Sequence, residues 1–80
     1  MNNTEKLINV FSNALGINKE KVNEQLSYQS VKQWDSMAHM VLVAEIEDSF
    51  NINIQDKDIT QMDTFGNTRN LLEKYNVQFD

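Results

Sequence analysis

Apolar residues recur at helical spacing in the first part of the chain. Four of them fall on one helical face: Leu7, Ile8, Phe11 and Leu15. Asn3 or Thr4 can cap the start of this helix, because side-chain oxygens of these residue types accept a backbone N–H of the first turn. Gly16 lies just past the last apolar position, where a left-handed residue ends many helices, and Ile17 can supply the apolar contact that accompanies such an ending. We therefore predict a first helix that starts near Asn3 or Thr4 and ends at Gly16.

Residues 18–33 follow neither helical spacing nor strict alternation. Their apolar members are scattered: Val22, Leu26, Tyr28 and Val31. We predict a long first loop here, with one short turn at residues 18–21. Because loops of this length without structure are uncommon in small domains, we expect the apolar residues to pin the loop across helix ends.

The second helix has the strongest pattern in the chain. Asp35 is a suitable N-cap, and the run that follows it contains no glycine or proline. Four residues make a core stripe: Leu42, Val43, Ile46 and Phe50. Three more apolar residues are left on one side, beside Glu47 and Asp48, and we call them the apolar flank: Met40, Val41 and Ala44. The flank indicates a surface built for contact.

Ile52 and Ile54 alternate with polar residues after the second helix, as in a strand. We reject a strand, because no other segment of the chain offers it a partner. An extended connection into a short helix capped by Asp56 accounts for the pattern better.

A final helix is expected after Asp63 or Thr64, either of which can cap it. Its inner face consists of Phe65, Thr68, Leu72 and Tyr75. The predicted fold is all-α: a small bundle of three principal helices plus one short helix, with a long first loop, in a single domain over residues 1–80.

Composition narrows the classes of function. A chain of 80 residues is too short to enclose a deep catalytic cavity, and without cysteine it has no disulfide, thiolate metal site or cysteine nucleophile. We therefore expect neither an enzyme nor a metal site. The N-terminus lacks the features of a signal peptide, and the longest apolar stretch, residues 40–44, is too short to span a bilayer. A soluble, monomeric, cytoplasmic protein is expected.

Charge is concentrated in the middle of the chain. Residues 35–63 carry seven acidic side chains against Lys57 alone, within a net charge of −5. Such a segment repels nucleic acid and anionic lipid, and it attracts partners that present Lys and Arg. A solvated acidic surface that keeps a small protein soluble explains the same bias.

The segment Trp34-Asp35-Ser36-Met37 carries the candidate chemistry. Ser36 lies in the first turn of the second helix, where free N–H groups and the helix dipole favour a phosphate group. Asp-Ser before a helix is also an ordinary capping sequence, so this feature alone does not decide between a modification site and a cap.

Asp35-Ser36-Met37 resembles the Asp-Ser-Leu signature of the acyl and peptidyl carrier proteins, with Met in place of Leu. That family also has a Glu-x-x-Phe-x-Ile-x-Ile pattern after this helix, and the chain has Glu47-Asp48-Ser49-Phe50-Asn51-Ile52-Asn53-Ile54 there. Length, serine position and the long first loop agree with the same pattern.

The resemblance implies that Ser36 is the attachment site of 4′-phosphopantetheine, transferred from coenzyme A by a phosphopantetheinyl transferase. Asp35 would cap the helix and assist the transferase through its bound Mg²⁺, and Met37 would lie beside the arm. The thiol of the arm would hold acyl or aminoacyl groups as thioesters for loading and transfer enzymes. Together with the apolar flank, Glu47 and Asp48 would form the docking surface for these partners. No residue of the chain itself would be a catalyst.

Residues around the motif depart from the carriers of fatty acid synthesis. The chain has Gln33-Trp34 before the motif and Ala38-His39-Met40-Val41 after it, which looks more like stand-alone carriers of specialised pathways. We interpret His39 as a surface residue, either simply solvated or close to the phosphate of the arm or to a partner. A hydrolase that pairs Ser36 with His39 is disfavoured, because an exposed helix start provides no shielded oxyanion pocket. The remaining alternative is an unmodified helical adaptor that binds a partner through the second helix.

Overall fold

Helices account for all the regular structure within residues 2–79, the part of the chain that this computed structural model describes. Met1 and Asp80, the ends of the expected domain, lie outside the described residues. The elements follow in the order α1 (Asn3–Leu15), η1, a 3₁₀ helix (Lys19–Lys21), α2 (Ser36–Phe50), α3 (Asp56–Ile59) and α4 (Phe65–Glu73). The predicted all-α bundle of three principal helices and one short helix is confirmed.

The ends of α1 follow from two local devices. The Asn2 side chain accepts a hydrogen bond from the backbone N–H of Glu5 (2.8 Å), so Asn2 is the cap and the prediction of Asn3 or Thr4 is wrong. The reason is that a cap needs extended backbone, which Asn2 has and the helical Asn3 lacks. Gly16 ends the helix in the left-handed region, at φ 66°, as predicted.

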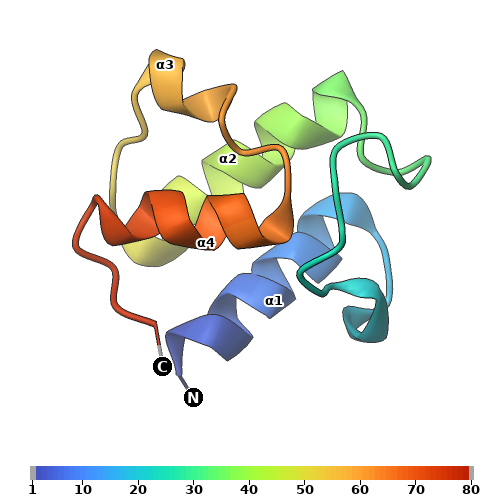
Figure 1. Cartoon of the computed structure of the whole chain (residues 1–80), viewed down its shortest axis with the longest axis horizontal. Coiled ribbons are helices and arrows are strands. Elements are labelled where there is room, and N and C mark those ends of the chain that lie inside the picture. The colour runs from blue at the N-terminus through green and yellow to red at the C-terminus, as the bar shows by residue number, and fades with distance from the viewer. Residues whose placement is uncertain (1, 80) are drawn as a thin grey trace.

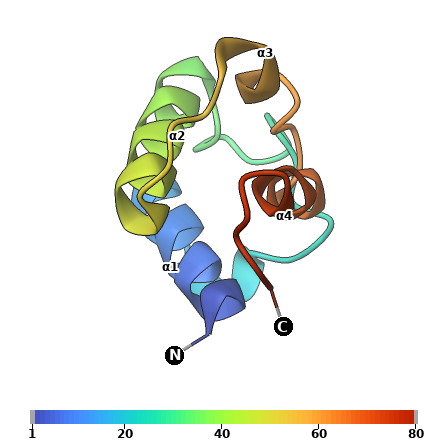
Figure 2. The same cartoon turned by 90° about the vertical axis from the view of Figure 1, so that its left-hand side faces the viewer.

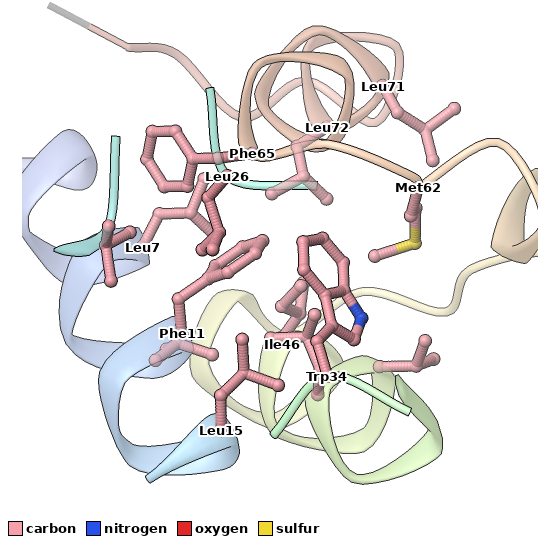
Figure 3. Packing of buried hydrophobic residues seen from close by; sticks show 14 of the residues in the cluster. Leu7, Phe11, Leu15, Leu26, Trp34, Ile46, Met62, Phe65, Leu71 and Leu72 are labelled. Carbon is pink, nitrogen blue, oxygen red and sulfur yellow. The ribbon is translucent and has the colours of Figure 1, made fainter. Parts of the chain in front are cut away.

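The core lies between α1, α2 and α4. α1 and α2 lie side by side and run antiparallel (Figure 1), and Figure 2 views α4 nearly end-on, across the core from α2. Trp34 and Phe11 are fully buried at the centre and meet edge to face, with ring centroids 5.5 Å apart (Figure 3). The predicted stripe of α2 is confirmed for Leu42, Val43 and Ile46, whereas Phe50 is half-buried.

The first loop is pinned across the bundle, as expected. Its residues Val22 and Leu26 are buried in the core. The loop also pairs with the segment before α4: Phe65 donates its backbone N–H to the Leu26 carbonyl (3.0 Å), and Tyr28 donates its own to the Asp63 carbonyl (2.7 Å). These bonds hold the loop against a part of the chain far away in sequence.

Hydrogen bonds to side chains shape the second half of the chain. A carboxylate oxygen of Glu47 accepts the backbone N–H of Ile54 (2.8 Å), which holds the connection through Ile52 and Ile54 that the sequence predicts, after Asn51 has ended α2 in the left-handed conformation. α3 begins at Asp56 without a side-chain cap, so the predicted capping role of Asp56 is wrong. Thr64 caps α4 by accepting the N–H of Asn67 (2.8 Å). No helix within residues 2–79 is long and apolar enough to cross a bilayer.

Candidate functional site

Ser36 is the first residue of α2 and is exposed. Asp35 precedes it with extended backbone, and its carboxylate accepts the N–H of Ala38 (2.9 Å), so the predicted cap is confirmed. This hydrogen bond engages the Asp35 carboxylate with the first turn of α2. Met37 is apolar yet 81 % exposed. All three predicted motif residues are therefore accessible from solvent.

One hydrogen-bond partner of Ser36 comes from the first loop. The Tyr28 hydroxyl lies 3.0 Å from Ser36 Oγ, and either oxygen can be the donor. From the sequence, Tyr28 is predicted only to help anchor the first loop. The contact depends on the path of the loop, which the spacing of apolar residues does not specify.

Tyr28, Trp34 and His39 form an aromatic cluster that reaches Ser36 through the Tyr28 hydroxyl. The His39 ring lies nearly parallel to the Trp34 indole, with centroids 6.0 Å apart and planes 22° apart. The Tyr28 ring meets both other rings edge to face, at 5.6 Å from His39 and 6.1 Å from Trp34. The cluster joins the first loop to the start of α2.

His39 is a structural bridge, and its interpretation as a solvated surface residue is wrong. The Trp34 Nε1–H donates to His39 Nδ1 (3.0 Å), and His39 Nε2 lies 3.0 Å from the Ile59 carbonyl oxygen. An indole N–H can only donate, so Nδ1 accepts and the proton of the neutral ring is on Nε2. His39 thereby connects α2 to the end of α3, and neither of its nitrogens is directed at Ser36.

An open pocket of about 270 Å³ lies beside this cluster. Its lining combines two of the cluster residues with the segment after α3: Tyr28, His39, Thr60, Met62 and Asp63. Because the hydroxyl of Tyr28 contacts Ser36 and the same side chain lines the pocket, the two features adjoin one another.

The apolar flank is exposed on α2. Met40 is 57 % exposed and Val41 49 %, and Ala44 is exposed as well. Asp48 is exposed next to them, while Glu47 is half-buried and uses its carboxylate to hold Ile54. The assignment of Glu47 and Asp48 to partner docking stays a prediction, and the bond to Ile54 already engages one carboxylate oxygen of Glu47.

Polar contacts around Asp58 connect α3 to the end of α4. The Tyr75 hydroxyl donates to the buried Asp58 carboxylate (2.5 Å) and accepts the N–H of Gln55 (3.0 Å), while Lys74 Nζ lies 3.5 Å from the other Asp58 oxygen. The hydrogen bond from Tyr75 lowers the pKa of Asp58, burial opposes this effect, and Lys74 reinforces it. The same hydrogen bond raises the pKa of Tyr75.

Compared with models of known protein families, the chain matches none. Function is therefore inferred from Ser36 and its surroundings.

Proposed function

We propose that the protein is an acyl carrier protein, modified on Ser36 with 4′-phosphopantetheine. The observation that carries the proposal is the placement of an exposed serine hydroxyl on the first residue of α2, directly after a capping aspartate. A helix start favours the negative charge of a phosphodiester, because its N–H groups and dipole point toward that group. The likeness of Asp35-Ser36-Met37 to the carrier signature supports the same conclusion.

The residues around Ser36 fit such a group. Oγ is accessible, its neighbours Asp35 and Met37 are exposed, and the hydroxyl of Tyr28 lies within hydrogen-bond distance. In the transfer, Ser36 Oγ attacks the phosphorus atom that bears pantetheine in coenzyme A. The bond from that phosphorus to the oxygen of adenosine 3′,5′-bisphosphate breaks, and the serine proton passes to a base of the transferase. When attached, the arm supplies the thiol that a cysteine-free chain lacks, and acyl or aminoacyl groups are held there as thioesters.

Partner enzymes would approach along α2. The apolar flank provides exposed contact area, and Asp48 provides negative charge that steers partners with Lys and Arg on their surface. We propose the phosphopantetheinyl transferase and the enzymes that load and transfer acyl or aminoacyl groups as these partners. The protein would act as a cytoplasmic monomer.

Intact-mass measurement tests the proposal. The purified protein is incubated with coenzyme A, Mg²⁺ and a broad-specificity phosphopantetheinyl transferase, and a gain of one phosphopantetheine group is expected. Ser36→Ala should remain folded by circular dichroism and gain nothing, whereas Ser49→Ala, which changes another serine of α2, should be modified like the wild type. A wild-type protein that stays unmodified with several transferases would overturn the proposal.

The exposure of the apolar flank also favours a second candidate, an unmodified adaptor that packs the flank against a partner helix. The mass experiment separates the two functions, because only the carrier gains the arm.

A further inference from the structure

The backbone around Tyr28 is held on both sides. Its N–H donates to the Asp63 carbonyl (2.7 Å), which ties the residue to the segment before α4. The next residue, Gln29, adopts φ 65°, a left-handed conformation, and donates its N–H to the Trp34 carbonyl (3.1 Å). The loop therefore turns sharply after Tyr28 and returns toward the start of α2. This turn brings a residue eight positions before Ser36 back beside it.

The Tyr28 ring is held as firmly as its backbone. It packs edge to face against the Trp34 indole (87°) and against the His39 ring (71°). Both of these neighbours are fixed in turn, because Trp34 is fully buried and His39 hydrogen bonds at both nitrogens. Because the Tyr28 ring packs against these two rings, the position of its hydroxyl is fixed by the fold. The 3.0 Å contact with Ser36 Oγ is thus formed before any partner binds.

A tyrosine hydroxyl can form a hydrogen bond with Ser36 both before and after the serine is modified. It has one proton to donate and lone pairs to accept. While Ser36 is free, the Tyr28 oxygen can accept a hydrogen bond from the Ser36 hydroxyl, which directs a lone pair of Oγ away from the loop. Once Oγ is esterified it has no proton, and the Tyr28 O–H can then donate to an oxygen of the phosphodiester. A charged acceptor strengthens such a bond.

We propose that Tyr28 is the positioning residue for the modification of Ser36, orienting Oγ for transfer and holding the phosphodiester afterwards. This inference rests on the proposed carrier function. Tyr28 contributes orientation and a hydrogen bond, while the proton of Ser36 leaves to the transferase.

Tyr28→Phe isolates the hydroxyl, because it keeps the ring in its packing. Steady-state transfer from coenzyme A is measured for the wild type and the variant at a temperature at which both are folded by circular dichroism. We expect kcat to fall about fivefold with KM for the carrier unchanged, the effect of one lost neutral hydrogen bond. In the modified proteins, the ³¹P resonance of the phosphodiester should differ between wild type and variant. Tyr75→Phe is the matched control, because the other tyrosine of the chain binds Asp58 and should leave kcat and the ³¹P resonance unchanged.

The outcomes separate the inference from the function on which it rests. A wild type that is modified, together with a Tyr28→Phe variant of equal kcat and identical ³¹P resonance, would overturn the role of Tyr28 and leave the carrier function intact. A raised KM at unchanged kcat would also overturn it, because it would assign Tyr28 to the transferase interface. If the wild type gains no arm at all, the carrier function itself fails.

Discussion

Replacing His39 with leucine should destabilise the fold, although the sequence alone predicts that His39 lies on the surface. The substitution removes the acceptor of the Trp34 Nε1–H and the donor to the Ile59 carbonyl. Trp34 is 0 % exposed, so water cannot replace the lost acceptor at the indole. Ile59 is half-buried, and water can replace the lost donor there at lower cost.

The unpaired indole N–H sets the size of the effect. A buried donor left without a partner costs about 1–3 kcal/mol, and leucine retains most of the apolar contact that the imidazole made with Trp34. We expect the free energy of unfolding to fall by about 2 kcal/mol. For a domain of this length each kcal/mol shifts the melting temperature by roughly 4–8 °C, so a decrease of about 8–16 °C is expected.

A double-mutant cycle with Trp34→Phe identifies the cause. Unfolding of the wild type, both single variants and the double variant is followed in urea by circular dichroism, because Trp34 is the sole tryptophan and fluorescence is lost with it. Once the indole N–H is gone, His39→Leu should cost about 1 kcal/mol less than it does in the wild type. An equal cost in both backgrounds, or a cost below about 0.5 kcal/mol in the wild type, would refute the hydrogen-bond account.

Three further predictions concern the rest of the molecule. Folding lowers the pKa of Asp58, so the hydrogen bond between Asp58 and Tyr75 stabilises the fold fully above pH 3.8, the ordinary carboxyl value, and this stabilisation is lost as the pH falls through the folded-state pKa. Folding raises the pKa of Tyr75, so at the alkaline end the stabilisation is lost only as the pH rises above 10.0. Melting curves should therefore show Tyr75→Phe less stable than wild type at neutral pH, with the difference shrinking below pH 3.8, and a difference constant with pH would contradict this. Gly16→Ala should lower the free energy of unfolding, measured in urea, by about 1 kcal/mol. The added Cβ meets no atom within 4 Å, so the cost comes from holding alanine in the left-handed conformation at φ 66°. If the protein is a carrier, Asp48→Lys should slow loading at low salt by more than Asp56→Lys on α3, with melting temperatures unchanged, and equal rates would place the interface elsewhere.

Features that depend on neighbours within one helical turn could be predicted from the sequence. Gly16 ends α1 and Asp35 caps α2 as expected, because a cap is decided by residues three or four positions away. The exposure of Met40 and Val41 also follows from a helix that has more apolar residues than one buried face can take. The choice of Asn2 over Asn3 was missed, since both have the same side chain and only the backbone distinguishes them.

Features that depend on distant parts of the chain could not be predicted. His39 is polar, and it faces inward only because Trp34 and the Ile59 carbonyl, on separate elements, offer it both a donor and an acceptor. Asp58 looks in sequence like one of several crowded surface acids, yet it is buried because Tyr75 and Lys74 lie opposite it. Tyr28 reaches Ser36 through a loop whose course no local pattern specifies.

The pairing of the first loop with the segment before α4 has a consequence for the order of folding. Two of its hydrogen bonds join residues 26 and 28 to residues 65 and 63, so the loop cannot take its final shape until most of the chain is present. Helices α1 and α2 lie within the first 50 residues and can associate before residues 63–65 have been synthesised. On a ribosome, which releases the N-terminal part first, the surroundings of Ser36 would be completed among the last, after the helix that carries it has formed.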